Sequence, residues 1–240
     1  MSSIWGAARD GDCARLRALL AEGQDVNEGK FSPRMTPLHF AADSGNADAV
    51  ALLLEHGADV NIKFENRNGC DGWTPLHHAT YIACCPRCIA LLVAAGADVN
   101  AKSTSDSTTP LLKVGQGTVP EQRKIACASL LIQAGARVND ANKYGDTPIS
   151  AAVRKGHREL AKLLFRAGAV IPKKRPTRWE PSDSARRLFD QVKARGGWQE
   201  HVRAHKRVLV GLVTKCTGKP GFPDDAAGLV VEFWCPPGGF

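Results

Sequence analysis

The sequence predicts an all-α solenoid of about five stacked helix-loop-helix units, and two recurring motifs predict it. The first motif is Thr-Pro-Leu-His at residues 36–39 and 74–77, with looser copies at 109–112 and 147–150. The prolines of the four copies lie 38, 35 and 38 residues apart. A repeat of this length indicates a stack of supersecondary units, in which each unit buries its apolar face against its neighbours.

The second motif ends each unit. It begins with Gly-Ala and continues in most copies to Val-Asn, at residues 57–61, 96–100, 135–139 and 168–169. A degenerate unit at the start of the chain ends similarly, in Gly-Gln-Asp-Val-Asn at 23–27. The repeated region therefore covers about residues 4–171.

The residues delimit two short helices in each unit. Thr36 can cap the start of the first helix, and Pro37 suits its first turn. Gly45 ends that helix because glycine tolerates positive φ. Residues 50–54 supply the apolar face of a second helix, which ends at Gly57. Neither helix is long enough to be stable alone in water, so each unit depends on its neighbours.

This pair of motifs resembles the ankyrin repeat. The resemblance implies two antiparallel helices followed by a hairpin-like finger, and a protein-interaction module (a scaffold or adaptor) that binds through its finger tips and the concave face of its first helices. It also implies that His39 and His77 hydrogen-bond the helix-start threonine and the neighbouring loop, which is a structural role.

The resemblance also implies contact residues for a protein partner. On the fingers these are Phe31, Arg34, Phe64, Arg67, Trp73, Lys143 and Tyr144. On the helix face they are Asp43, Tyr81, Arg154 and Lys155. Aromatic residues and arginine are favoured anchors at interfaces. For Trp73 the alternative is packing against the adjacent finger.

The loops contain the departures from the repeat. The finger at 62–73 has twelve residues, whereas that at 28–35 has eight, and longer loops of a repeat array often bind. Extra residues also lie between two helices at about 115–120. Gly115 and Gly117 in that segment do not make a phosphate-binding loop, because the strand and the Gly-Lys-Ser/Thr signature are missing.

The sequence argues against an enzyme, a cofactor, a bound metal and a small-molecule substrate. It contains no Gly-x-Ser-x-Gly, P-loop or His-Glu-x-x-His motif. Cys85-x-x-Cys88 has the spacing of zinc ligands, but a structural zinc site usually combines two such pairs. These thiols, with Cys84, are interpreted as small semi-buried residues, because free cysteine behaves as a small hydrophobe. A redox role finds no support in the sequence, since no βαβ pattern surrounds the pair.

The C-terminal part differs in composition. The chain has a net charge of +8, and residues 172–240 contribute thirteen Lys/Arg against seven Asp/Glu, a net +6. We expect an ankyrin-type domain at 4–171, a basic linker at 172–181 and a small, mostly helical segment at 182–240. That segment is predicted to cover the apolar face of the last repeat. The alternative is a docking segment of a ubiquitin-ligase adaptor within 200–240.

Two features carry the docking alternative. Phe222-Pro223-Asp224-Asp225 looks like the opening of an F-box, although too few residues follow it. Leu212-x-x-x-Cys216 is similar to the elongin-contacting motif of the SOCS box. Residues 217–220 (Thr-Gly-Lys-Pro) then interrupt the helix where that box continues it.

Composition also bears on the compartment. The longest apolar runs fall short of the roughly 18 residues of a membrane span, and the scattered cysteines are typical of a reducing compartment. We therefore expect an intracellular, cytoplasmic protein that does not enter membranes. Lys174-Arg175 and Arg186-Arg187 mimic a bipartite import signal, which leaves the nucleus as an alternative. Aromatic residues are not interleaved with the basic ones, which argues against nucleic-acid binding.

Overall fold

The computed structural model describes residues 3–29, 35–64 and 72–170 of the chain. The chain divides into one unit of residues 1–169 and a second of 170–240. The predicted basic linker at 172–181 and the predicted cap or docking segment at 182–240 lie outside the described residues.

The first unit confirms the predicted all-α solenoid of five helix pairs. The pairs are α1 (Ile4–Asp10) with α2 (Cys13–Ala21), α3 (Pro37–Ser44) with α4 (Ala47–Glu55), α5 (Pro75–His78) and the π-helix η1 (Ala79–Ala83) with α6 (Pro86–Ala94), α7 (Pro110–Gln116) with α8 (Glu121–Gln133), and α9 (Pro148–Arg154) with α10 (Arg158–Arg166). We number these pairs repeats 1 to 5. In the described part of the chain, β-pairing is confined to an isolated bridge between Phe64 and Trp73.

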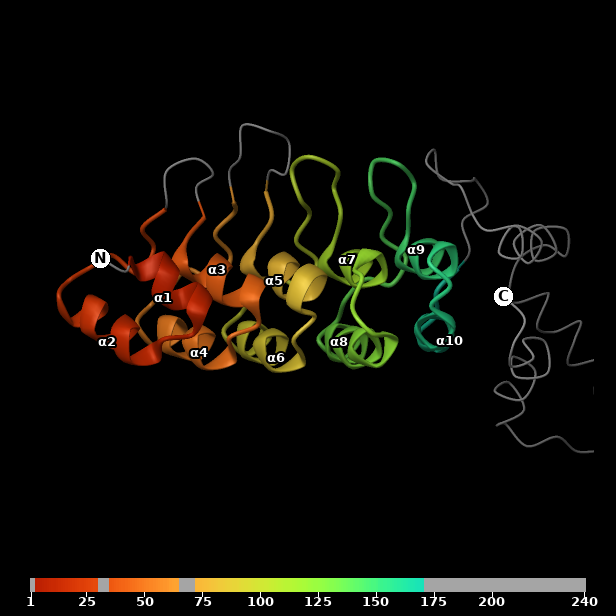
Figure 1. Cartoon of the computed structure of the whole chain (residues 1–240). Helices are drawn as coiled ribbons and strands as arrows, with labels where there is room; N and C mark the ends of the chain where they lie inside the picture. Colours follow the sequence, from red (N-terminus) through yellow and green to blue (C-terminus); the bar gives the residue numbers. More distant parts are fainter. Residues whose placement is uncertain (1–2, 30–34, 65–71, 171–240) are drawn as a thin grey trace, which may run out of the picture. The chain divides into compact units, whose positions relative to one another are not determined.

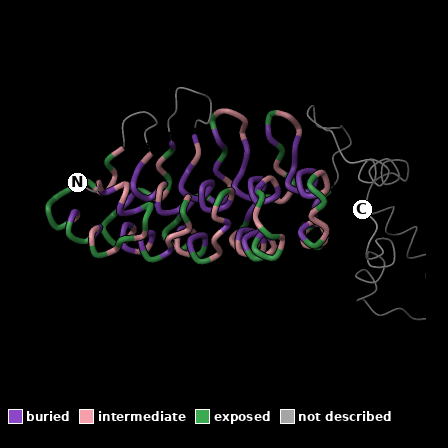
Figure 2. Tube along the Cα trace, in the orientation of Figure 1, coloured by how far each residue is buried: buried purple, intermediate pink, exposed green. Residues whose placement is uncertain are grey.

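The helices form two rows. The first helices of successive repeats contact one another, as do the second helices, and the fingers extend from one side of the array (Figure 1). Buried residues gather between the two rows (Figure 2). Leu38, Leu76, Leu111 and Ile149, which follow the four repeated prolines, are all buried, as are the small residues Ala41 and Ala42 of α3. Small residues let neighbouring helices approach closely, which explains their place in the motif.

Threonine starts the first helix of repeats 2 to 5. In repeat 2, the Thr36 hydroxyl lies 2.9 Å from Nδ1 of His39, and the ring's Nε2 lies 3.2 Å from the carbonyl oxygen of Trp73 in the next finger. His77 repeats this with Thr74 and with the carbonyl oxygen of Thr108. The predicted structural role of both histidines is confirmed. In repeat 5, the Ser150 hydroxyl replaces the ring and accepts a hydrogen bond from the Thr147 amide at 2.8 Å.

The asparagine that ends the second motif links successive repeats. Asn61 Oδ1 accepts a hydrogen bond from the Asp98 amide at 2.8 Å, and its Nδ2 donates to the Gly96 carbonyl at 3.1 Å. Asn100 makes the same two contacts with Arg137 and Gly135. Gly96 and Gly135 have φ of 87° and 89°, a conformation that glycine adopts readily. The motif thus encodes a ladder between repeats.

The π-helix η1 accommodates one extra residue in repeat 3. In repeat 2, Gly45 lies nine positions after Thr36, whereas in repeat 3 Cys84 lies ten positions after Thr74. Both residues end the first helix with left-handed backbone, at φ 75° and 42°. A single inserted residue is the usual origin of such a π-bulge, which is often found at functional sites.

The extra residues of repeat 4 are divided between a loop and a longer helix. The segment between α7 and α8 runs from Gly117 to Pro120, and α8 has 13 residues where α4 and α6 have nine. Lys124, in the first turns of α8, is fully buried, and its Nζ donates to the Gly117 carbonyl at 2.6 Å. The lysine therefore fixes this loop against the helix that follows it.

Candidate functional site

Trp73 and Tyr81, predicted separately from a finger and a helix face, lie together in the structure. The indole of Trp73 meets the ring of Tyr81 edge-on at a centroid distance of 5.4 Å and stacks on His77 at 6.2 Å. Trp73 ends the finger before α5, and Tyr81 lies in η1. Both residues are half-buried, so each packs within the array and is partly accessible to water.

Lys113 of α7 completes this cluster from the next repeat. Its Nζ lies 4.1 Å from the centroid of Trp73 and 5.4 Å from that of Tyr81. Nζ also lies 3.9 Å from a carboxylate oxygen of Asp106. A cation over aromatic faces is stabilised more when it is desolvated, and Lys113 is buried. Sequence reasoning missed Lys113 because its aromatic partners, Trp73 and Tyr81, belong to the preceding repeat.

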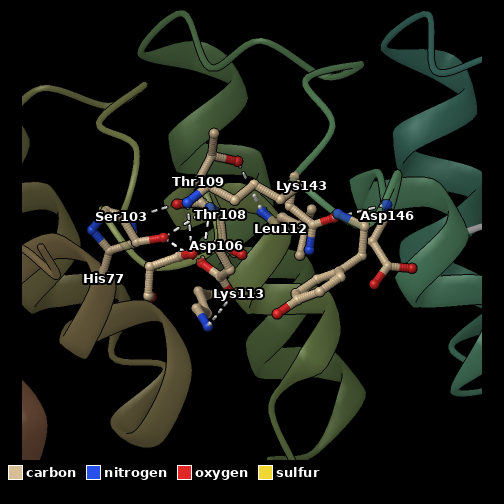
Figure 3. Close-up of polar contacts among 12 residues, drawn as sticks. His77, Ser103, Asp106, Thr108, Thr109, Leu112, Lys113, Lys143 and Asp146 are labelled. Atoms are coloured by element: carbon tan, nitrogen blue, oxygen red, sulfur yellow. Dashed lines mark hydrogen bonds and ion pairs between the residues drawn. The ribbon is translucent and has the colours of Figure 1, made fainter. Parts of the chain in front are cut away.

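The finger that precedes α7 supplies Asp106, the acidic residue of the cluster, as Figure 3 shows. The Ser103 hydroxyl donates to the Asp106 carboxylate, and the Thr108 amide donates to the Ser103 hydroxyl at 2.8 Å. Burial opposes ionisation of Asp106, but the hydrogen bonds from Ser103 and Thr108, together with Lys113, outweigh it and lower its pKa. Asp106 is therefore held as a carboxylate opposite the ammonium of Lys113.

The two capping histidines next to the cluster are neutral at ordinary pH. Burial lowers the pKa of His39 to about 3 and that of His77 to about 4. Removal from water disfavours the charged imidazolium, and the hydrogen bonds to the carbonyl oxygens of Trp73 and Thr108 offset only part of this effect. These rings serve structure rather than proton transfer.

Asp43, a predicted helix-face residue of repeat 2, contacts His78 of repeat 3. The Asp43 carboxylate lies 2.9 Å from Nδ1 of His78, so the helix-face candidate from repeat 2 is held against repeat 3. Phe64, by contrast, is 5% exposed. Its ring packs on His39 and His78 at centroid distances of 6.2 and 5.8 Å, which places it in the base of the finger.

Four more of the predicted residues lie on the last finger and at the end of α9. Lys143 is exposed, and its Nζ donates to the carbonyl oxygens of Thr104 and Ser105, which joins two fingers. Tyr144 is half-buried beside it. Arg154 pairs with the buried Asp146 at 3.0 Å, whereas Lys155 ends α9 and is exposed. Phe31, Arg34 and Arg67 lie outside the described residues.

Ile82 is a further surface residue that sequence reasoning missed. It follows Tyr81 in η1 and is 52% exposed. Among the large hydrophobic residues that the structure describes, Ile82 and Val170 are the exposed ones. The sequence signal for this extra residue is the spacing within repeat 3, where Cys84 lies ten positions after Thr74, against nine positions from Thr36 to Gly45 in repeat 2.

The cysteines pack as small residues in this region. Cys88 is fully buried and occupies the place of Ala49 in repeat 2, as predicted. Burial raises the pKa of the Cys88 thiol, and the Cys85 thiol next to it adds to that shift. Within 3–29, 35–64 and 72–170, no three His, Cys, Asp or Glu side chains are grouped so that they could bind a metal ion. Nor does any helix of these segments combine the length and apolar character of a membrane span.

The sequence of this chain matches a protein-family model and several known proteins. The model for ankyrin repeats, in three copies, matches residues 4–103 and 87–175. Nuclear factor NF-kappa-B p105 subunit of Gallus gallus is 35% identical over 134 residues, which are 55% of this chain and 13% of that protein. Ankyrin repeat and SOCS box protein 16 of Homo sapiens is 31% identical over 194 residues, which are 66% of this chain and 41% of that protein. Probable E3 ubiquitin-protein ligase XBOS33 of Oryza sativa subsp. japonica is 49% identical over 74 residues, or 30% of this chain and 13% of that protein. The chain thus spans less than half the length of each of these relatives.

Proposed function

The chain belongs to the ankyrin-repeat family, and from this membership we propose that it acts as a scaffold or adaptor that binds a protein partner through the first-helix surface around Tyr81. Ankyrin repeats are protein-interaction modules. The observation that carries the specific proposal is the preorganised cluster of Trp73, Tyr81 and Lys113 beside the exposed Ile82.

Rigid aromatic residues next to an exposed aliphatic side chain suit a binding anchor. Such anchors carry most of the energy of an interface. The rings of Trp73 and Tyr81 are held by contacts with Lys113 and the histidines, so a partner would not have to immobilise them. Ile82 adds apolar area that stays exposed to water in the unbound chain.

Charged residues on both sides of the cluster support an extended contact surface. Asp43 lies on α3 of repeat 2, whereas Arg154 is the last residue of α9 in repeat 5 and Lys155 follows it. Lys143 and Tyr144 provide a further edge on the last finger. Phe64 is not part of the surface that we propose, because its buried ring supports the base of the finger.

Affinity capture with the full chain tests the proposal. We expect Ile82→Ser to weaken retention of the captured proteins by roughly tenfold, as loss of an interfacial anchor does. The matched control is Gln122→Ser, at an exposed position of α8 in the other row of helices. Equal retention by both variants, with circular dichroism unchanged, would move the binding surface elsewhere.

A second candidate function is that of a substrate adaptor of a ubiquitin ligase. Two relatives, the ankyrin repeat and SOCS box proteins 16 and 6 of Homo sapiens, have names that favour it, and Leu212-x-x-x-Cys216 supplies the sequence motif. The test is binding of the full chain to purified elongin. Binding that is lost in Leu212→Ala supports adaptor activity, and failure to bind leaves the repeats as the functional part.

A further inference from the structure

The turns between the first and second helices of successive repeats lie next to one another. From the α3–α4 turn, Nδ2 of Asn46 donates a hydrogen bond to the carbonyl oxygen of Arg9 at 2.6 Å, which joins repeat 2 to repeat 1. Asp48, in the first turn of α4, pairs at 2.7 Å with Arg87 in the first turn of α6, which joins repeat 2 to repeat 3. These contacts place the turns of repeats 1 to 3 in one row.

The row continues through repeats 4 and 5. Gly117, which follows α7, lies so close to repeat 3 that a Cβ added to it would be 2.8 Å from the carbonyl oxygen of Tyr81. Oε1 of Glu121 on α8 accepts a hydrogen bond from the amide of Glu159 on α10 at 2.8 Å. We call this row the turn edge and define it by the helix ends and turns at residues 9–15, 43–49, 82–88, 115–123 and 153–160.

Ile82 lies at the middle of the turn edge. It belongs to repeat 3, with two repeats before it and two after it, and it is 52% exposed. The neighbouring Tyr81 and Ala83 are half-buried and add to the apolar surface. Because removal of exposed apolar area from water is favourable, this point of the edge suits a contact with another molecule.

The net charge of the turn edge changes sign across repeat 3. In repeats 1 and 2 the edge has four carboxylates and two arginines, a net charge of −2: Asp10, Asp12, Asp43 and Asp48 with Arg9 and Arg15. In repeats 4 and 5 it has four cations and two carboxylates, a net charge of +2: Arg123, Arg154, Lys155 and Arg158 with Glu121 and Glu159. The complete repeats follow the same trend, since residues 1–60 contain nine Asp/Glu against five Lys/Arg and residues 109–170 contain ten Lys/Arg against four Asp/Glu. The edge is therefore complementary to a second copy of itself that runs in the opposite direction.

Two opposite charges of the edge flank Ile82 and are accessible. The side chain of Asp48 in repeat 2 is 73% exposed, although it pairs with Arg87. Arg123 in repeat 4 is exposed as well. An ion pair between exposed side chains contributes little free energy, so the contact with Arg87 leaves Asp48 able to interact with a second cation.

We propose that two copies of the chain associate along the turn edge, antiparallel to each other, about a two-fold axis that passes through repeat 3. The inference rests on the proposed function, because it keeps Ile82 as the interfacial anchor and names a second copy as the partner that covers it. A two-fold axis places Ile82 against Ile82 of the second copy. It also places repeats 1 and 2 of each copy opposite repeats 4 and 5 of the other, so acidic and basic halves meet twice. A parallel pair would oppose like charges.

The pair is expected to be weak and sensitive to salt. Its centre is a small apolar contact, and its flanks are exposed charges, whose attraction salt screens. Sedimentation equilibrium of the full chain over a dilution series measures it, in about 0.05 M and about 1 M sodium chloride. At low salt the mass should rise with concentration toward twice 25.7 kDa, and at high salt it should stay near 25.7 kDa.

Two other results would contradict the two-fold pair. A mass of 25.7 kDa at every concentration in low salt would exclude self-association. A mass that grows beyond two chains would indicate open head-to-tail assembly, in which the contact does not close on itself.

Reversal of single charges tests the antiparallel arrangement. Asp48→Arg and Arg123→Asp should each raise the dissociation constant of the pair by roughly tenfold or more, because each places like charges opposite one another twice. An equimolar mixture of the two variants should recover wild-type association, because every reversed charge then meets an opposite one. Failure of the mixture to recover, with circular dichroism unchanged in both variants, would overturn the proposal.

The matched control for the charge is Arg137→Asp. Arg137 is exposed and lies beyond the other end of α8, away from the turn edge. It makes the same change of charge as Arg123→Asp and should leave the dissociation constant within about twofold of the wild type. An equal loss in both variants would show that net charge, rather than the edge, controls association.

Ile82→Ser separates this inference from the proposed function. It should weaken self-association of the full chain as well as retention of captured proteins. A wild type that stays monomeric, yet loses captured proteins on this substitution, would reject the second copy and retain the proposed function. A pair that forms and recovers on mixing, with capture unaffected by Ile82→Ser, would support the pair and reject the proposed function.

Discussion

Nζ of the buried Lys124 lies 2.5 Å from Nε2 of His157, and this contact joins α8 of repeat 4 to the start of α10 in repeat 5. The same ammonium donates to the carbonyl oxygen of Gly117. Burial lowers the pKa of Lys124, and burial together with the nearby ammonium lowers that of His157. The imidazole is therefore neutral and accepts the hydrogen bond.

Lys124→Met should destabilise the chain. Methionine fills a similar volume but leaves the Gly117 carbonyl and the His157 ring without their donor, and each lost partner costs roughly 1–3 kcal/mol. Urea unfolding measures the change. Arg123→Met, at the exposed neighbouring position, is the matched control and should change the free energy of unfolding by less than about 0.5 kcal/mol. Equal values for the two variants would show that the buried contact contributes nothing.

Acid should weaken the fold through the capping histidines. His39 and His77 have folded-state pKa values of about 3 and about 4, below the unfolded value of 6.5. The unfolded chain therefore binds more protons between these limits, and stability that is fully present above pH 6.5 is lost as the pH falls toward 4. At pH 5 each histidine should account for roughly 2 kcal/mol of lost stability.

Denaturant titrations at several pH values between 4.5 and 7 measure this dependence. His77→Gln should be less stable than the wild type at pH 7, but its stability should change less with pH. An unchanged slope in that variant would assign the acid sensitivity to other groups.

Asn100→Ala should loosen the boundary between repeats 3 and 4. The change removes hydrogen bonds of 2.8 and 3.2 Å to Arg137 and Gly135. Two partly exposed hydrogen bonds correspond to roughly 1–2 kcal/mol. Asn27→Ala, which removes one contact of similar length and one of 3.5 Å at the first boundary, should cost less. Thermal unfolding of both variants gives the comparison, and the reverse order would contradict the ladder model.

Leu53→Ala should test the packing between the two rows of helices. Leu53 lies on α4 and is fully buried. Truncation of a buried leucine costs roughly 2–5 kcal/mol because it removes apolar contacts and leaves a cavity. Leu54→Ala, at the half-buried next position, is the control and should cost less. A loss of only a few tenths of a kcal/mol for Leu53→Ala would show that this side chain does not support the core.

The sequence by itself determined the repeat, the helix pairs and their boundaries. These features depend on contacts between residues that are only a few positions apart in the chain. Thr36 and Pro37 fix a helix start, and Gly57 fixes an end, whatever lies beyond the unit. The roles of His39 and His77 were also accessible through the repeated motif.

Tertiary structure decided what the side chains of different repeats do together. Lys113 meets Trp73 across about forty residues, and Lys124 meets His157 across 33. Phe64 resembled a finger contact in the sequence but is buried at the finger base, where His39 and His78 surround it. The physical reason is that the period of the repeat states which residues lie at equivalent positions, whereas the contacts between repeats depend on how the helices stack, which the local pattern does not contain.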